Sequence, residues 1–336
     1  MKKRVALIIL TLFIMIFGFA GWKFFGPTIR VPNEKFFFVS TGSTYENVKE
    51  NLNDLNIISG GKWFDWAARM IGYKNVKPGR YEIKKGMSLA GLVRVLKNGR
   101  QTPVNLVITK FRTKESLASR VGNSFECDST QMILFLNNRD SLKVYGLDSN
   151  TVMSAAMPLT YTIKWNTTPR KIFDRFYTAY KTFWTVERKK KADSLGLSPA
   201  EVSTLASIID EETNSATDKP LVASVYLNRL AKGMPLQADP TLKYALKNFE
   251  LKRILNEHKD VRSPYNTYAN KGLPPGPICT PALETIEAVL DSPKTDYLYF
   301  VANSTFDGTH IFTNNYAEHM KYARLYQQEL NKRNIK

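Results

Sequence analysis

The chain has 336 residues, enough for two or three compact units, and its 43% hydrophobic and 12% aromatic content excludes an intrinsically disordered protein. Its net charge of +18 indicates an anionic partner, such as a membrane surface, an acidic polymer or nucleic acid. The cations are spread along the chain without a nucleic-acid-binding motif, so we predict no nucleic-acid partner.

The first 25 residues are predicted to anchor the chain in a membrane. A basic cluster, Lys2-Lys3-Arg4, precedes an uncharged apolar run from Val5 to Trp22, which is about the length that crosses a bilayer. We therefore expect a cytoplasmic tail over residues 1–4, a transmembrane helix over 5–25, and the rest of the chain outside. A cleaved signal peptide is the alternative, although the run is long for one and Gly18-Phe19-Ala20 is a weak cleavage signal.

Residues 35–100 contain a weak internal repeat of strand, glycine turn and capped helix. The first copy joins a strand at Phe36–Val39 to a helix capped by Thr44, and the second joins Tyr81–Ile83 to a helix capped by Ser88. Trp63, Trp66 and Ala67 suggest a further helix between the copies. The pattern resembles LysM-like modules, which bind N-acetylglucosamine polymers. A purely structural spacer is the alternative.

The segment from residue 103 onward begins with a β-rich run at Val104–Ile108. Two helices are predicted next, over residues 114–121 and 168–192. Between them, Met157–Tyr161 is typical of a loop that leads into a strand.

Glu212 stands where an amphipathic helix should carry an apolar residue. Ser198 to Glu201 form a capping box with proline at the first helical position, so a helix should begin there. The apolar stripe of this helix continues through Ile208 and Ile209 and falls next on Glu212, while Asp210 and Glu211 point elsewhere. A carboxyl against apolar neighbours, near the negative end of a helix dipole, should have a raised pKa and could act as a general acid. A solvated acidic face or a structural salt bridge is the alternative.

The remaining elements alternate between helices and loops. A helix is predicted from Asp218 to about Lys232, a polar turn over residues 236–241, and a short helix through Leu242 and Leu246. Loops rich in proline and glycine follow at 263–268 and 272–277, then strands at 297–301 and 310–312 and a basic helix over 316–333. This order favours an α+β fold, in which a transmembrane helix and a small LysM-like subdomain precede a larger mixed domain.

The cysteines and histidines do not suggest a metal centre. Cys127 and Cys279 could form a disulfide outside the cytoplasm, but two distant cysteines make no framework. The three histidines, His258, His310 and His319, lack ligand spacing, so we predict no metal and no cofactor.

Five ordered blocks between residues 200 and 320 resemble the MltG (YceG-like) endolytic murein transglycosylases. The blocks are Leu205–Thr213 with Val222–Leu230, Leu236–Thr241, Tyr265–Tyr268, Gly272–Ile278 and Tyr297–Val301. Two positions depart from the family pattern. Asp210 replaces a glutamate, and the segment Ala155–Tyr161 lacks an acid that the family often carries there.

The resemblance implies the domain organisation and the reaction. It implies a LysM-like subdomain over 35–100 and a YceG-like catalytic domain over 103–336, with core motifs at 198–320. The enzyme would be a lytic transglycosylase, a carbon-oxygen lyase acting on polysaccharide, that cleaves the MurNAc-β-1,4-GlcNAc bond within glycan strands. Glu212 would be the catalytic acid, and the products would carry 1,6-anhydromuramyl ends.

The resemblance also suggests a setting for this reaction. The location would be the inner (cytoplasmic) membrane, single-pass, with a cytoplasmic N-terminus and a periplasmic or extracytoplasmic catalytic domain. The partners would be peptidoglycan strands and cell-wall synthases, and the enzyme would terminate the elongation of nascent strands.

Five loop residues are candidates for holding the sugar, because amide, hydroxyl and aromatic groups match sugar hydroxyls, acetamides and ring faces: Gln237, Asp239, Tyr265, Asn266 and Thr267. Two other functions stay open. If Asp239 activates water across the cleft from Glu212, the protein is a muramidase. If Glu212 is not needed, the protein is a peptidoglycan-binding scaffold.

Overall fold

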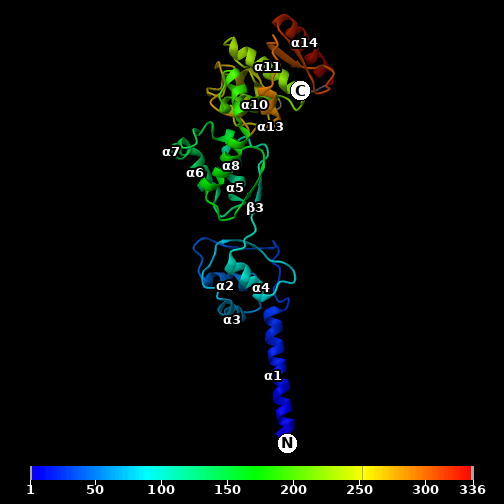
Figure 1. Cartoon of the computed structure of the whole chain (residues 1–336). Coiled ribbons are helices and arrows are strands. Elements are labelled where there is room, and N and C mark those ends of the chain that lie inside the picture. Colours follow the sequence, from blue (N-terminus) through cyan, green and yellow to red (C-terminus); the bar gives the residue numbers. More distant parts are fainter. Residues whose placement is uncertain (1, 252, 334–336) are drawn as a thin grey trace. The chain divides into compact units, whose positions relative to one another are not determined.

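An apolar helix, α1 (Lys2–Phe25), opens the computed structural model of the chain, which describes residues 2–251 and 253–333 (Figure 1). Lys3–Phe25 is long and apolar enough to cross a membrane and, among the described residues, is the one helix with this property. Met1 of the predicted cytoplasmic tail and residues 334–336 of the predicted catalytic domain lie outside the described residues. The chain divides into two units: the first runs to Leu106 and includes 122–127 and 162–168, and the second holds the remainder.

The first unit is built from the predicted repeat. Strand β1 (Phe36–Val39) pairs antiparallel with β2 (Gly79–Glu82), so the strands of the two copies are partners. Helices α2 (Tyr45–Asp54) and α4 (Leu89–Asn98) begin after their predicted caps, Thr44 and Ser88. The third helix, α3 (Gly61–Ile71), lies between the copies as expected. The core contains Phe37, Leu52, Phe64, Tyr81 and Leu92, all fully buried.

The segment after residue 103 contains more helices than predicted. Strand β3 (Val104–Val107) pairs with β4 (Thr160–Ile163). The helices of the segment are α5 (Lys114–Gly122), α6 (Ser129–Asn137), α7 (Arg139–Lys143), the 3-10 helix η1 (Val152–Ala155), α8 (Pro169–Phe183) and α9 (Val186–Ser194). The prediction of one helix over 168–192 was wrong. The chain leaves the helix at Trp184, whose side chain is buried, and Thr185 caps a new one.

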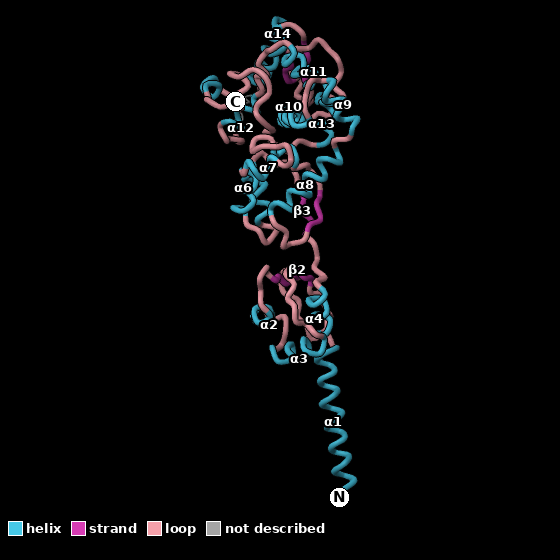
Figure 2. Tube along the Cα trace, turned by 60° about the vertical axis from the view of Figure 1, so that its left-hand side comes forward, coloured by secondary structure: helices cyan, strands magenta, loops and turns pink. Residues whose placement is uncertain are grey.

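Helix α10 (Pro199–Glu212) lies at the centre of the second unit (Figure 2). It packs against α11 (Asp218–Ala231), α12 (Asp239–Ala245) and α13 (Leu283–Leu290), and every residue from Val202 to Ile209 is buried. The 3-10 helix η2 (Asn256–Asp260) follows α12. Strands β5 (Tyr299–Ala302) and β6 (His310–Thr313) form an antiparallel hairpin, and α14 (Tyr316–Lys332) packs on it. The mixed helix and strand content of the predicted fold class is confirmed.

Candidate functional site

Helix α10 delivers Glu212 to the site as its last residue. The predicted capping box starts the helix: the Ser198 Oγ accepts from the Glu201 amide at 3.3 Å, and the Ser198 amide donates to Glu201 Oε2 at 2.8 Å. The side chains of Val202, Leu205 and Ile209 are fully buried and hold the helix in the core. Since the chain turns to an extended conformation at Thr213, Glu212 sits at the carboxyl end of a rigid helix.

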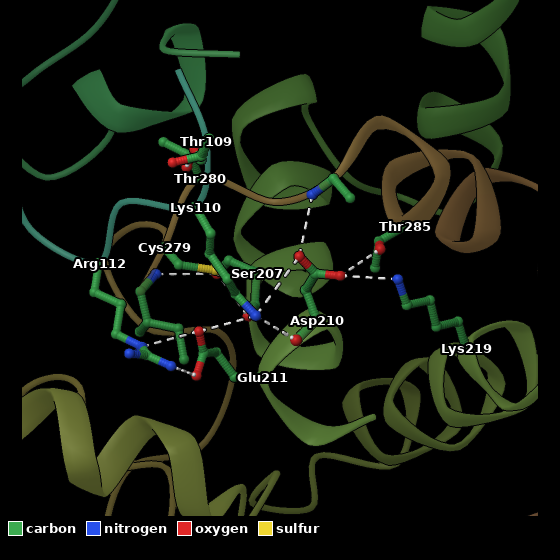
Figure 3. Close-up of polar contacts among 12 residues, drawn as sticks. Thr109, Lys110, Arg112, Ser207, Asp210, Glu211, Lys219, Cys279, Thr280 and Thr285 are labelled. Carbon is green, nitrogen blue, oxygen red and sulfur yellow. Dashed lines mark hydrogen bonds and ion pairs between the residues drawn. The ribbon is translucent and has the colours of Figure 1, made fainter. Parts of the chain in front are cut away.

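Asp210 pins one side of the last turn of α10 (Figure 3). Its carboxylate accepts from Lys219 Nζ at 2.9 Å, from Thr285 Oγ1 at 2.7 Å and from the Ala282 amide at 3.2 Å. Burial alone would raise the pKa of Asp210, but the hydrogen bonds from Thr285 and Lys219 outweigh it and hold the pKa below its usual value. Asp210 is therefore an ionised structural anchor that ties α10 to α11 and α13.

Glu211 pins the opposite side of the same turn. Arg112 donates to both of its carboxylate oxygens, at 3.1 and 2.9 Å, and Lys110 Nζ lies 3.1 Å from Oε1 (Figure 3). Lys110 also donates to the backbone carbonyl of Asp210 at 2.6 Å. A cation therefore lies at the carboxyl end of α10, where it interacts favourably with the helix dipole. Two members of the acidic triplet are thus engaged in ion pairs, and Glu212 alone is left for the cleft.

The proline-rich loop at 272–280 is fastened to the buried face of α10. Ser207 Oγ accepts from the Ile278 amide at 3.0 Å, and Thr280 Oγ1 donates to the Thr109 carbonyl at 2.7 Å. Gly276 passes so close to Asn150 that a Cβ atom would lie 2.1 Å from its carbonyl oxygen. Glycine is required there because any side chain would displace the loop.

The Glu212 carboxyl has the protonation behaviour of a general acid. The residue keeps some accessible surface towards the cleft, but protein surrounds its carboxyl on most sides. This burial raises its pKa to about 7, a hydrogen bond from Tyr226 opposes the rise, and the nearby charge of Asp239 adds to it. Tyr226 is itself buried and donates to Glu212 Oε1 at 2.9 Å, which leaves Oε2 for another partner.

Two cavities adjoin at Glu212 and share no other lining residue. The smaller, about 300 Å³, is lined by Glu212, Tyr226, Arg229, Leu236, Gln237, Asp239, Tyr268, Tyr299, Phe300, Tyr316 and His319. The larger, about 640 Å³, is lined by Glu212, Thr213, Asn214, Ser215, Ala302, Asn303, Phe306, Asp307, Gly308, Thr309, His310 and Tyr326. Glu212 therefore stands in the middle of a cleft that continues past it in two directions.

Two of the five predicted sugar-binding residues line this cleft. Asp239 lies in the smaller cavity, where the Tyr268 hydroxyl donates to its Oδ1. Gln237 is in the same cavity, and its Oε1 accepts from Arg229 Nη2 at 2.8 Å. Its backbone φ of 54° is strained for a residue other than glycine, which is common where a binding loop is held in a fixed shape.

The other three candidates make their side-chain contacts inside the protein. Asn266 is buried and donates to the Lys259 and Val261 carbonyls. Thr267 is buried too, and its Oγ1 accepts from the Ala238 amide at 3.0 Å. Tyr265 packs on the ring of Tyr244, with centroids 4.6 Å apart. These residues support the loop that carries Gln237 and Asp239.

Two features of the cleft have no counterpart among the predicted site residues. Tyr226 belongs to the apolar stripe of α11, so its sequence position indicates a core residue and not a hydrogen-bond donor to the acid. His310 Nδ1 lies 2.9 Å from Asp218 Oδ2, and both side chains are largely buried at the edge of the larger cavity. The pair joins positions 92 residues apart, so spacing along the chain could not reveal it.

Known proteins resemble this chain over most of its length. The model of the YceG-like family matches residues 37–325. An endolytic murein transglycosylase of Bacillus subtilis is 28% identical over 310 residues, which cover 88% of this chain and 85% of that protein. The endolytic murein transglycosylase of Streptococcus pneumoniae is 28% identical over 84% of this chain, which spans only 56% of that longer protein. The crystal structure of a YceG-like protein from Listeria monocytogenes superposes with a TM-score of 0.58 at 28% identity, over 86% of this chain and 99% of that one.

Proposed function

The chain belongs to the YceG-like family, and we propose that it is a membrane-anchored endolytic murein transglycosylase that cleaves the MurNAc-β-1,4-GlcNAc bond within glycan strands. The observation that carries the proposal is Glu212: a carboxyl with a pKa of about 7, on a rigid helix end, in the middle of a two-sided cleft. Because cavities extend from it in two directions, sugars can occupy both sides of the bond that it attacks, as cleavage within a strand requires.

The reaction needs only one carboxyl. Glu212 protonates the glycosidic oxygen as the bond to the muramyl C1 breaks, so the carboxyl becomes a carboxylate and an oxocarbenium-like centre develops at C1. The carboxylate then takes the proton of the muramyl C6 hydroxyl as that oxygen closes on C1. The product is a 1,6-anhydromuramyl end, no water is consumed, and Glu212 ends protonated, as it began.

Tyr226 and Asp239 suit the two halves of this cycle. The hydrogen bond from Tyr226 fixes one oxygen of Glu212 and stabilises the carboxylate after proton transfer. The charge of Asp239 favours the protonated form before the transfer and stabilises positive charge at C1 afterwards. Gln237, next to Arg229 and the ring of Tyr299, supplies an amide for the sugar substituents in the same cavity.

His310 is proposed to contact the glycan in the larger cavity. Asp218 accepts from its Nδ1, which fixes the orientation of the ring and leaves Nε2 to bond a sugar hydroxyl. Its role is to position the strand.

The remaining parts of the chain support a location of this reaction at the cell wall. We propose that α1 is a single-pass anchor in the inner membrane with its N-terminus in the cytoplasm, which puts the cleft in the periplasmic or extracytoplasmic space. The strand-helix unit over 35–100 is proposed to act as a LysM-like module that binds the glycan, and glycan polymerases are the proposed partners. Cleavage of a strand near its synthesis would terminate its elongation.

A muramidase is the second candidate, because Asp239 shares the cavity with Glu212. Against it, one Asp239 oxygen is already occupied by the Tyr268 hydroxyl. The two reactions leave different ends: a lyase makes anhydromuramyl ends and a hydrolase makes reducing ends. Digestion of purified peptidoglycan by the full chain in detergent, followed by mass spectrometry, separates them, and Glu212→Gln should abolish either activity.

A further inference from the structure

The end of the membrane anchor is built into the core of the first unit. Phe24 is buried, and its ring packs edge-on against Trp66 of α3 with centroids 5.1 Å apart. The next residues are fixed by backbone hydrogen bonds, from the Ile29 amide to Met87 and from the Arg30 amide to Ile57. Among the described residues, no flexible linker separates the anchor from the first unit. The depth of α1 in a bilayer therefore also sets the distance of this unit from the membrane surface.

That height brings α3 to the membrane surface. The hydrocarbon region of a bilayer is about 30 Å thick, which about 20 helical residues cross. Counted from Val5, the first residue after the basic cluster, this span ends at Phe24, so Phe19 lies about 8 Å inside the boundary. The ring of Trp63 is only 6.2 Å from the ring of Phe19, centroid to centroid. A side chain that touches a lipid-embedded residue is itself at the depth where headgroups meet acyl chains.

The outward face of α3 has the composition of an interfacial helix. Trp66 and Met70, one turn apart, keep 42% and 63% of their surface exposed, although both are large and apolar. The exposed cations Lys62 and Arg69 flank them on the same helix. The helix has one acid, Asp65, whose side chain keeps 40% of its surface exposed, accepts from the Tyr45 hydroxyl at 2.8 Å and pairs with Lys49. The exposed face is therefore aromatic and carries an excess of cations, because the charge of its one acid is paired with Lys49.

We propose that α3 lies in the membrane interface beside the anchor, with Trp63, Trp66 and Met70 among the outer acyl chains and Lys62 and Arg69 against lipid phosphates. In both views α3 lies next to the C-terminal end of α1 (Figure 1, Figure 2). Helix and anchor together hold the first unit flat on the bilayer. The proposal does not depend on the reaction in the second unit.

A glycan polymer is the competing occupant of this face, since exposed tryptophans also stack on sugar rings. The contact of Trp63 with Phe19 favours lipid, because a sugar bound there would have to displace acyl chains from the anchor. The two occupants can be told apart by their effect on tryptophan emission.

The test uses the full chain with Trp22→Phe, reconstituted in phospholipid vesicles with or without brominated acyl chains. This background removes the one tryptophan of the anchor and leaves Trp63, Trp66, Trp165 and Trp184. Brominated lipid should quench its emission. Adding Trp63→Phe and Trp66→Phe should reduce the quenching to the level set by the other two tryptophans. The matched control is Trp165→Phe, at a half-buried site elsewhere in the first unit, which should leave the quenching intact.

Because each variant is compared with itself in the two lipids, a loss of folded protein does not mimic the result. Quenching that is absent in the Trp22→Phe chain, or unchanged when Trp63 and Trp66 are replaced, would overturn the proposal. So would an emission shift of these two tryptophans by soluble N-acetylglucosamine oligomers in the absence of lipid quenching.

Discussion

Replacement of Tyr226 by phenylalanine should move the pH dependence of cleavage to higher pH. The Tyr226 hydroxyl donates to Glu212 Oε1 at 2.9 Å, and this bond is the main influence that keeps the Glu212 pKa down at about 7 against burial. The pKa of Tyr226 is itself raised well above its usual value, by burial and by Glu212, so the hydroxyl stays protonated and remains a donor. Phenylalanine fills the same space without the donor.

The size of the shift follows from the strength of the bond. A hydrogen bond to a charged group contributes about 1.5 to 3 kcal/mol, and one pKa unit corresponds to about 1.4 kcal/mol. Loss of the bond should therefore raise the Glu212 pKa by about 1 to 2 units. Since the first step needs Glu212 protonated, activity falls as the pH rises through this pKa, and the alkaline limb of the profile should move up by the same amount.

The assay is the initial rate of soluble muropeptide release from peptidoglycan between pH 5 and pH 9. This range extends about two pH units on either side of a pKa of about 7. The rate at low pH should fall, because the carboxylate formed in the transition state loses its donor. A Tyr244→Phe variant, changed outside the cleft, is the matched control and should keep the wild-type profile. An alkaline limb that stays in place or moves to lower pH in Tyr226→Phe would refute the assignment of Glu212 as the acid.

Three further substitutions test other parts of the site. Glu212→Gln should stabilise the fold at pH 8 by about 1 to 3 kcal/mol but not near pH 4.5. Folding raises the pKa of the Glu212 carboxyl from 4.5 to about 7, so the wild-type fold loses stability as the pH increases between those values. Thermal unfolding at both pH values measures the difference, and Glu211→Gln, which removes an ion pair with Arg112, should destabilise the fold instead. Lys219→Met should cost about 3 kcal/mol in urea unfolding, the low end for a broken buried ion pair, because it leaves the Asp210 carboxylate with only the more distant cation Lys110, 3.9 Å away; a cost below about 1 kcal/mol would contradict the anchoring role. Asp218→Asn should slow cleavage roughly tenfold, the effect of losing one hydrogen bond, because it weakens the contact that orients the His310 ring; unchanged turnover would remove His310 from the glycan-binding surface.

Local patterns were enough to predict the elements that position the acid. The capping box at Ser198 and the apolar stripe of α10 depend only on neighbours within a few residues, and both placed Glu212 at an unusual position on the helix. The helix caps Thr44 and Ser88 and the strands of the first unit followed from the same kind of signal. Where such local signals agree with the fold, sequence reasoning succeeds.

Tertiary contacts decided what the sequence could not. The hydroxyl of Tyr226 is used as a donor only because α11 packs beside the end of α10, and Asp218 meets His310 only through the β5–β6 hairpin. Asn266 and Thr267 carry polar groups that suit a sugar, but these groups form hydrogen bonds to the backbone of neighbouring loop segments. The break at Trp184 has the same origin, because burial of one large ring outweighed helix propensity over 168–192.

The central claim is that Glu212 alone serves as acid and then as base in a reaction that consumes no water. The direct measurement is mass spectrometry of the fragments that the full chain releases from purified peptidoglycan in water enriched in oxygen-18. We expect 1,6-anhydromuramyl ends without the heavy isotope, and none from Glu212→Gln. Reducing ends that carry oxygen-18, or anhydromuramyl ends formed by Glu212→Gln at the wild-type rate, would contradict it.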